Sequence, residues 1–513
     1  MSVIIEKLEY FSKNIWISLV IIGLAALSIR LYFFPYGVPI TEDGLFYFRY
    51  AVDTSILGHF PNTSLSNNGW PLFVSVFFSI FHSNSVLDYM TLQRLLSVLI
   101  SVLTIIPVYL LVSRFFEPKY ALIGTFLFAF EPRTIQNSLL GITEPLYILL
   151  VTLSLYFFLS KRTNVIYLSF SVAALCAQIR YEGIVLFFII SIMFFVRQKK
   201  ERKTIIKYSI AFAIFIITIL PMSYVRTITI GSDGITDGVI SGGEVYGIEA
   251  TSNQENMISG ILSYVFIGLQ ALIKYLGWVM IPYFIFFVPF GIFLMLKKRN
   301  NDNFTIIFAI IVLSIPALYA YSRGIQETRY LYVLHPIFCI LSIFAIKFLH
   351  DKIRKILLII VLGVVISSVL FLTIKSTDYE YEREAFEIAK HIPSSANSIN
   401  GYYPESKYVR IPGMLDKFPV LSSTVSFGPK VIKDTNYQSL NEFIEKNRED
   451  GLDYLVVDGK IERPVFLNDI FINDKGYPYL TKVFDSIELG YKYHVKMYKI
   501  DYERFDLIYN KNN

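Results

Sequence analysis

The sequence predicts an α-helical polytopic membrane protein with a small C-terminal extracytoplasmic α/β domain, and three observations lead to this fold class. First, 54% of the 513 residues are hydrophobic and only 17% are charged, whereas soluble globular proteins carry about 25% charged residues. Second, the apolar residues gather in runs of about twenty, the length that crosses about 30 Å of hydrocarbon. Third, the segments between these runs alternate between basic and acidic, which is the charge pattern that orients a membrane protein.

About 11 runs are candidates for spanning helices, and the composition changes after residue 375. The first run is too long for a signal-peptide core and lacks a small-residue cleavage site, so we expect it to stay as a signal anchor. We expect a multi-span domain at 1–375, whose first outer loop is 35–91, and a soluble domain at 376–513, where no run could span. The expected spans are 15–34, 92–113, 119–132, 143–160, 164–179, 183–197, 204–224, 277–296, 304–322, 331–349 and 355–374.

The Lys and Arg residues predict the orientation of these spans. If the N-terminus lies inside, each expected inner loop is short and basic, and the outer segments carry scattered acidic residues. This alternation places the domain at 376–513 on the extracytoplasmic side of a multi-pass protein of the cell membrane. It also accounts for the net charge of +6, which therefore does not indicate nucleic-acid binding. The inner basic loops are those around 114–119, 161–162, 197–207, 297–299 and 347–355.

Two apolar segments fit the membrane interface better than a full crossing. Residues 68–81 form a run of only about fourteen residues, which is typical of an interfacial or re-entrant piece. Residues 258–275 are expected to form an interfacial helix before the span at 277–296, because an odd number of crossings must join the acidic outer loop to the basic loop at 297–299.

The soluble domain is predicted to be small and α/β, from the spacing of its apolar residues. It contains no Gly-rich phosphate loop and no cluster of His or Cys, so we assign it no chemistry. The expected elements are helices at 377–391 and 440–447, a buried strand at 453–458 and an edge strand at 491–500.

The first outer loop carries two acidic residues, Glu42 and Asp43, within ten residues of the first span. A carboxylate there lies near headgroup depth, where it is unfavourable beside a lipid phosphate unless it binds a metal or acts as a base. Residues 43–52 are expected to form a short helix in the interface, on which adjacent positions point in different directions, so at most one of the two carboxylates faces a cleft. Both residues also fit an exposed helix N-terminus, where acidic side chains favour the helix dipole.

Three further outer segments carry ionisable residues beside apolar sequence, and such residues are functional candidates. In the segment 131–145, Arg133 and Glu144 bracket an apolar stretch, although Glu144-Pro145 also fits a helix start. In the short turn after the span at 164–179, Arg180 opposes the orientation bias, so a lipid phosphate, a salt bridge to Glu182, or snorkelling to the headgroups must offset its charge. Two more arginines, which fit phosphate binding or interfacial anchoring equally well, are Arg323 and Arg329.

These motifs, in this order over about residues 15–350, resemble the C-type glycosyltransferase superfamily, which includes protein O-mannosyltransferases, aminoarabinose transferases and the catalytic subunit of oligosaccharyltransferase. Glu42-Asp43, followed by Arg49 and Gly58–Pro61, resembles the acidic motif of their first loop. The segment 138–144 is similar to their second acidic motif, and 180–183 resembles a turn that many members place near the donor phosphate. The sequence departs from oligosaccharyltransferase in one respect: the expected soluble domain lacks a Trp-Trp-Asp-Tyr-Gly motif, since all three tryptophans precede it. This departure argues against transfer of an oligosaccharide to asparagine.

The resemblance implies an inverting, hexosyltransferase-type enzyme that moves a sugar from a polyprenyl- or dolichyl-phosphate carrier to an acceptor hydroxyl at the outer membrane face. The implied partners are the lipid-linked donor, a protein, lipid or glycan acceptor, and membrane lipids. The implied roles are general base for Asp43, with Glu42 beside it; stabilisation of the leaving phosphate by Arg180 and by Arg329 or Arg323; and positioning of the acceptor by Glu144, Arg133, Arg49 and Glu182. Asp43 and Glu144 could instead hold a divalent metal such as Mg²⁺ or Mn²⁺ through oxygen ligands.

Other functions remain open at this stage. An oligosaccharyltransferase-like protein would share the motifs, and a lipid-linked sugar flippase would share the spans and the outer basic residues. A flippase would be expected to show ionisable residues at mid-bilayer and paired repeats with broken helices, whereas the cytoplasmic halves of these spans are nearly free of charge and no repeat is apparent. A non-catalytic subunit with residual motifs is the third alternative.

Overall fold

The computed structural model describes residues 14–512, apart from 41, 62–64, 66, 84, 199–202, 241–256, 299, 354, 394, 398–436, 462 and 474–475. The chain divides into two compact units, each described here by itself. Unit 1 comprises Met1–Phe34, Phe60–Val74 and Gln93–Ser376, and unit 2 comprises Pro35–His59, Ser75–Leu92 and Thr377–Asn513. The expected domain border at residue 376 stays a prediction.

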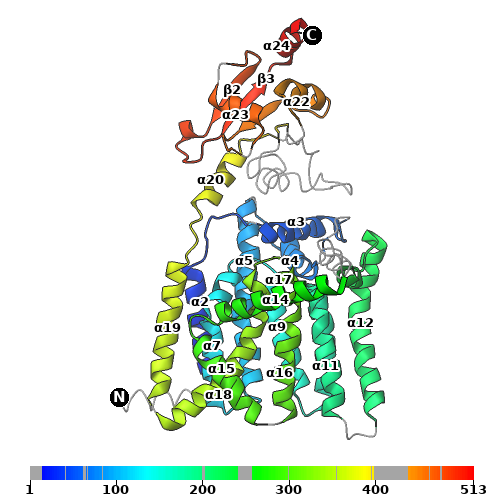
Figure 1. The fold of residues 1–513 in the computed structure, drawn as a ribbon, viewed down its shortest axis with the longest axis vertical. Coiled ribbons are helices and arrows are strands. Elements are labelled where there is room, and N and C mark those ends of the chain that lie inside the picture. The colour runs from blue at the N-terminus through cyan, green and yellow to red at the C-terminus, as the bar shows by residue number, and fades with distance from the viewer. Residues whose placement is uncertain are drawn as a thin grey trace. The chain divides into compact units, whose positions relative to one another are not determined.

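Unit 1 is a bundle of apolar helices. In Figure 1 the axes of α9, α11, α12, α16 and α19 are roughly aligned, and α12 and α19 lie at opposite edges of the bundle. Its elements are α2 (Ile15–Tyr32), α6 (Ile105–Val112), α7 (Pro118–Ala129), α8 (Pro132–Ser138), α9 (Glu144–Phe158), α10 (Thr163–Ile179), η1 (Tyr181–Gly183), α11 (Ile184–Arg197), α12 (Thr204–Ile230), α14 (Met257–Met280), α15 (Phe284–Lys297), α16 (Asn301–Leu313), α17 (Ile315–Ser322), η2 (Thr328–Leu334), α18 (His335–Lys352) and α19 (Ile356–Ile374). The border between the units falls within two helices, α4 (Gly69–Ile80) and α5 (Val86–Leu103), so each has residues in both units.

The structure is mostly helical, as predicted, because a helix satisfies every backbone polar group within itself and can therefore lie in hydrocarbon. In the described part of the chain, 7 helical segments are long and apolar enough to cross a membrane, and shorter apolar helices accompany them. The segment that contains α18 is 83% buried in its most apolar window, whereas α12 is 11% buried. The helix α18 is thus central to the bundle, and α12 is peripheral. The number of crossings, about 11, stays a prediction.

Several expected spans are divided in the structure. The span expected at 277–296 begins only at α15, because α14 ends at Met280 and Pro282, which has no backbone N–H, lies in the three-residue break. The span expected at 304–322 consists of α16 and α17, with Ser314 between them and Pro316 in the first turn of α17. The helix α14 runs across the direction of its neighbours in Figure 1, although its segment Leu262–Met280 is long and apolar enough to cross a membrane. Its interfacial position stays a prediction.

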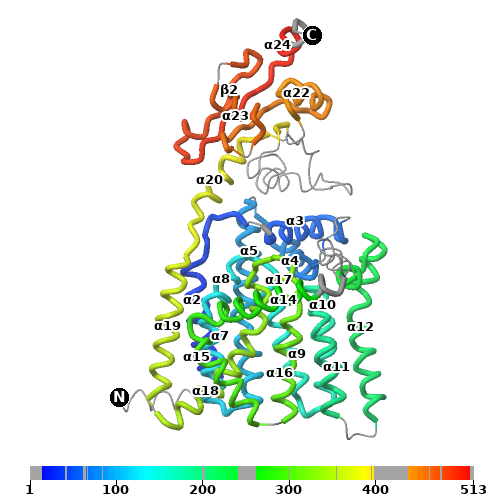
Figure 2. The backbone as a smooth tube through the Cα atoms, viewed as in Figure 1, coloured from blue at the N-terminus to red at the C-terminus, as the bar shows by residue number. Residues whose placement is uncertain are grey.

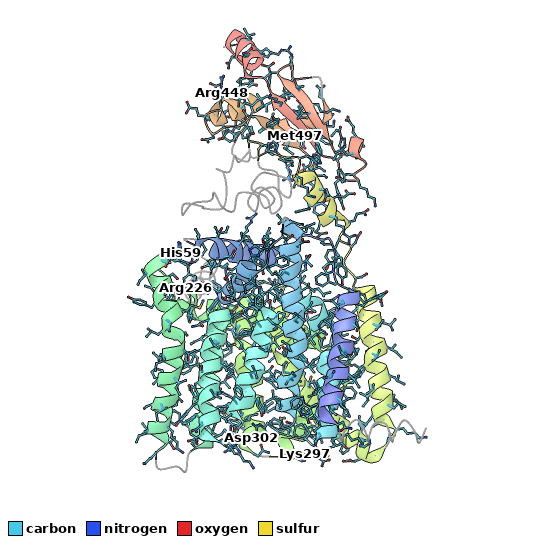
Figure 3. The ribbon with its side chains drawn as sticks, turned by 180° about the vertical axis from the view of Figure 1, so that it is seen from behind. His59, Arg226, Lys297, Asp302, Arg448 and Met497 are labelled. Carbon is cyan, nitrogen blue, oxygen red and sulfur yellow. The ribbon has the colours of Figure 1, made fainter. Side chains whose placement is uncertain are left out.

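Close helix approach in unit 1 depends on glycine where helices touch. Gly291 of α15 packs on α18, where an added Cβ would lie 1.9 Å from the carbonyl oxygen of Leu341. Any side chain at this position would push the two helices apart, in agreement with the enrichment of small residues at helix contacts in membranes. At the ends of the bundle, Figure 3 places Arg226 near one end and Lys297 and Asp302 near the other. The latter pair lies in or beside a predicted inner loop.

Unit 2 contains a small α/β fold, as predicted. Its elements are α3 (Glu42–Leu57), α20 (Glu380–Ala389), α22 (Leu440–Asn447), β1 (Tyr454–Val457), α23 (Val465–Ile472), β2 (Leu480–Asp485), η3 (Ile487–Leu489), β3 (Lys496–Ile500) and α24 (Tyr502–Asn512). In Figure 2 the C-terminal part of this unit is coloured from yellow at α20 to red at α24. The strands form an antiparallel sheet in the order β1-β3-β2.

The strand expected at the edge of this sheet, 491–500, is instead its central strand, so that expectation was wrong. Alternate residues of β3 belong to two different apolar cores: Tyr498 and Ile500 to one, Met497 to the other. The first core also contains residues of α22, α23 and α24, and the second contains residues of α20. Alternation in the sequence therefore reflected two covered faces, and not one face exposed to water.

Candidate active site

Arg180 is the centre of a buried ionic cluster in unit 1. Its Nη1 donates to Glu144 Oε1 at 2.7 Å and to Thr143 Oγ1 at 3.0 Å, and its Nη2 donates to Glu182 Oε1 at 3.0 Å. Arg180 is only 9% exposed and Glu144 4% exposed. A single guanidinium group thus bridges two carboxylates away from bulk water, which is the geometry for which arginine is better suited than lysine.

The local backbone explains how these side chains meet. Glu144 opens α9 and is followed by Pro145, whose fixed φ and missing N–H suit the first turn of a helix. Arg180 follows the last residue of α10 in an extended conformation, with φ −141° and ψ 126°, so its side chain leaves the helix direction. Gly183 then lies so close to α10 that a Cβ would be 2.6 Å from the Cys176 carbonyl carbon and oxygen. The chain can reverse this tightly only with glycine.

A second guanidinium group approaches the same carboxylate. Arg329, on η2, places its Nε 3.9 Å from Glu144 Oε1 and 3.7 Å from Glu327 Oε2. These separations are ion-pair distances and are too long for hydrogen bonds. Glu144 therefore lies between two cationic groups that come from helix ends far apart in the sequence.

These residues line a pocket with about 350 Å³ of empty space, counting its open mouth. Two tyrosine rings flank the Arg180 guanidinium group, at 5.9 Å for Tyr147 and 5.7 Å for Tyr330 between Cζ and ring centroid, which is cation–π distance. Burial raises the pKa of the neighbouring Tyr181 to about 12, so this hydroxyl stays protonated at neutral pH. The lining residues are Glu144, Tyr147, Ile148, Arg180, Glu182, Leu313, Pro316, Arg329, Tyr330 and Val333.

The structure brings together four of the residues predicted from the sequence, Glu144, Arg180, Glu182 and Arg329. Of the three origins offered for the charge balance of Arg180, the salt bridge to Glu182 is present, and Glu144 adds a second. Both offset the charge that opposes the orientation bias. The pocket also includes the rings of Tyr147 and Tyr330, which sequence reasoning missed, although Tyr330 directly follows a predicted site residue.

Two other predicted residues lie elsewhere in unit 1. Arg323 donates to the Tyr319 hydroxyl at 3.2 Å, with its guanidinium group 5.5 Å from that ring. Arg133 donates to the Trp278 carbonyl oxygen at 2.8 Å and lies over the Phe371 ring. Neither is among the residues that line the pocket, whereas Arg329 is.

The predicted acidic motif lies on α3 of unit 2. Glu42, Asp43 and Arg49 all belong to this helix, which is longer than the expected 43–52. Their roles stay predictions. Sequence reasoning missed Asp53 on the same helix, which is 2% exposed and has one carboxylate oxygen with no hydrogen-bond partner among the described residues. Burial raises the pKa of Asp53 to about 8, against the opposing effect of the Arg49 charge.

The described residues do not fit a metal site in unit 1. No group of three or more His, Cys, Asp or Glu that could hold an ion occurs among the residues that the structure describes. Glu144 and Glu182 both direct an oxygen to the Arg180 guanidinium group, so a cation beside them would have to compete with a buried arginine.

Comparison with known proteins places this site in context. Residues 69–225 match the family model described as dolichyl-phosphate-mannose-protein mannosyltransferase. No curated protein sequence matches the chain. The oligosaccharyltransferase of Archaeoglobus fulgidus in complex with Zn and sulfate is similar in structure, with 16% identity and a TM-score of 0.55 over 87% of this chain and 68% of that one.

Two further structures contain lipid phosphates. The A. fulgidus oligosaccharyltransferase AglB in complex with an inhibitory peptide and a dolichol-phosphate is 15% identical, with a TM-score of 0.55 over 88% of this chain and 70% of that one. ArnT from Cupriavidus metallidurans, bound to undecaprenyl phosphate, is 11% identical, with a TM-score of 0.56 over 94% of this chain and 97% of that one. These matches confirm the resemblance that the sequence motifs predicted: the chain has the fold of the C-type membrane glycosyltransferases.

Proposed function

We propose that this protein is a membrane glycosyltransferase that takes a sugar from a polyprenyl- or dolichyl-phosphate carrier and transfers it to an acceptor hydroxyl. The observation that carries the proposal is the pocket in which Arg180 and Arg329 converge beside Glu144. Two structures of similar fold contain a polyprenyl-type phosphate. ArnT matches this chain over nearly the full length of both, which supports a lipid-phosphate donor for this protein too.

The pocket is suited to the leaving group of such a reaction. As the bond between the anomeric carbon and the phosphate oxygen breaks, its electron pair moves to that oxygen and the phosphate gains negative charge. Arg180 and Arg329 would stabilise this charge. Because the site is largely removed from water, positively charged groups already in place are more effective there than in solution. Glu144 and Glu182 keep the Arg180 guanidinium group oriented before the donor arrives.

For the acceptor half of the reaction we propose Asp43 of α3 as the base, because Glu42-Asp43 resembles the first-loop acidic motif of the C-type glycosyltransferases. The acceptor oxygen attacks the anomeric carbon and forms the new glycosidic bond, and its proton passes to the carboxylate of Asp43. A general base of this kind contributes about 10²–10⁴-fold. A single displacement would invert the configuration at the anomeric carbon. We further propose that the pocket and the C-terminal part of unit 2 face the extracytoplasmic side, since the turns that carry Arg180 and Arg329 are predicted outer segments.

The acceptor is proposed to be a protein hydroxyl, in keeping with the family model that matches residues 69–225. Transfer to asparagine is the second candidate, because the archaeal oligosaccharyltransferase has a similar fold. The absence of a Trp-Trp-Asp-Tyr-Gly motif from the sequence argues against it. Peptides that carry Ser or Thr, compared with peptides that carry an Asn-X-Thr sequence, would distinguish the two acceptors.

The test is transfer of radiolabelled sugar from a polyprenyl-phosphate donor by the purified full-length protein in detergent. We expect product from the wild type and little from Arg180→Gln or Arg180→Lys. We expect a normal rate from Arg162→Gln, a matched change at an exposed arginine at the opposite end of α10 from Arg180. Movement of the lipid-linked sugar across sealed vesicles without product would instead support a flippase. An inactive protein that neither binds nor moves the lipid would support a non-catalytic subunit.

A further inference from the structure

A short segment of the chain contacts the backbone of both turns that carry the ionic cluster. This segment, Asn67–Trp70, which we name the strap, lies in unit 1 and precedes most of α4. None of its residues lines the pocket. Its role has to be sought in what it holds.

The strap and one residue of α5 hold the turn before Glu144. The carbonyl oxygen of Gly141 accepts two hydrogen bonds, from Trp70 Nε1 at 3.0 Å and from Gln93 Nε2 at 2.7 Å. Both donor side chains are 0% exposed. A carbonyl oxygen has two lone pairs, so these donors saturate it. Gly141 has φ +73°, a left-handed conformation in which the chain turns from α8 towards α9.

The strap also contacts the turn that carries Arg180. Asn67 Oδ1 accepts a hydrogen bond from the Tyr181 backbone N–H at 3.2 Å. Gly69 lies against the end of α10, where an added Cβ would be 2.6 Å from the Gln178 carbonyl oxygen. The strap is thus joined to the backbone on either side of Arg180, and three residues before Glu144.

These contacts set the relative position of two helix ends whose side chains must meet. The Arg180–Glu144 hydrogen bond of 2.7 Å joins residues 36 positions apart. A shift of about 1 Å in a reacting constellation can lower a rate by about 10²-fold. We propose that Trp70, Gln93 and Asn67 are positioning residues, which act through the Gly141 carbonyl and the Tyr181 N–H to hold Glu144 and Arg180 in the geometry that receives the donor phosphate. This inference rests on the proposed function of the pocket.

The test is binding of polyprenyl phosphate to the purified full-length protein in detergent, with polyprenol as the control for the lipid tail. Trp70→Phe removes the indole N–H and keeps a ring, and Gln93→Met removes the amide and keeps the length. We expect each to weaken polyprenyl-phosphate binding by about tenfold, the effect of one lost hydrogen bond to a buried group. The matched changes at exposed positions, Trp278→Phe and Gln270→Met, should leave binding within about twofold of the wild type.

A double-mutant cycle separates positioning from folding. In a Glu144→Gln background we expect Trp70→Phe to change binding by less than about twofold, because its effect passes through Glu144. An equal loss in both backgrounds would show a general folding effect and overturn the inference. So would normal binding by both Trp70→Phe and Gln93→Met. If Trp70→Phe does not fold, the Gln93→Met cycle decides alone.

The same experiment tells this inference apart from the proposed function. If the wild type binds polyprenyl phosphate no better than polyprenol, or if Arg180→Gln binds it normally, the proposed function is wrong and the inference fails with it. If Arg180→Gln abolishes binding while the strap variants behave like the wild type, only the inference fails.

Discussion

Replacement of Arg180 tests the site most directly, and its cost can be worked out from the structure. Arg180 is paired with Glu144 at 2.7 Å and with Glu182 at 3.0 Å. At an effective dielectric constant of about 20, each pair has a gross attraction of about 6 kcal/mol before desolvation is subtracted. Removing one partner of a buried pair costs about 3–5 kcal/mol, because the remaining charge is left uncompensated. We therefore expect Arg180→Gln to lower the free energy of unfolding by about 3 kcal/mol.

A compensated variant separates this stability effect from function. Arg180→Met combined with Glu144→Gln and Glu182→Gln removes the three charges of these two ion pairs and leaves Arg329 beside Glu327. Replacing a buried ion pair by well-packed uncharged residues of similar volume is often neutral for stability. We expect this triple variant to unfold at a temperature near that of the wild type and yet to bind no polyprenyl phosphate. Arg180→Lys should keep the charge, lose the bridge between the two carboxylates, and bind the lipid phosphate about tenfold more weakly.

The assays are thermal unfolding in detergent and direct binding of polyprenyl phosphate by the same preparations. Arg162→Gln is the control, since Arg162 is exposed. Normal lipid-phosphate binding by the triple variant would contradict the proposed role of Arg180, because it would show that the arginine is a purely structural partner of the two glutamates.

Three further predictions concern other parts of the chain. Asp43→Asn should abolish sugar transfer with normal expression and membrane insertion; near-normal transfer would remove Asp43 as the base. Gly291→Ala should destabilise the protein by about 1–3 kcal/mol or more, because its Cβ would clash with Leu341. Gly363→Ala should not, because an added Cβ there would have no described residue within 4 Å beyond its own helix backbone and chain neighbours. Burial raises the pKa of Asp53 from 3.8 to about 8, so the folded state retains its proton and the free energy of unfolding falls as the pH rises between these values. Asp53→Asn should raise the unfolding temperature at pH 7.5 and flatten the dependence of stability on pH. An unchanged pH profile would contradict the raised pKa of Asp53.

The sequence alone predicted those features that depend on short stretches of chain. The positions of most spanning helices follow from apolar runs, because transfer into hydrocarbon is favourable or costly segment by segment. The turn at Arg180 and the helix start at Glu144-Pro145 follow from glycine and proline, whose conformational limits are local. In the C-terminal part of unit 2, α22 begins and ends as predicted, and β1 lies within the expected strand.

The limits of the sequence appear where one segment must be compared with another. Nothing local in 491–500 showed that β3 would have a strand on each side. From the sequence, the three segments that carry Arg180, Glu144 and Arg329 are each predicted to be outer turns, and both structural and functional interpretations of them were open. In the structure, ion pairs join Arg180 and Arg329 to Glu144, and all three residues line one pocket. Arg323 and Arg133 are not among its lining residues.

From the amino-acid sequence alone come the apolar runs, the alternation of charge between them, the candidate residues and the resemblance to the C-type membrane glycosyltransferases. Tertiary structure alone decided which of those residues meet, that two tyrosine rings flank Arg180, and that Trp70 and Gln93 hold the carbonyl of Gly141. The physical reason is that burial in a bilayer is a property of each segment by itself. A hydrogen bond between residues 71 or 48 positions apart exists only after the helices have packed.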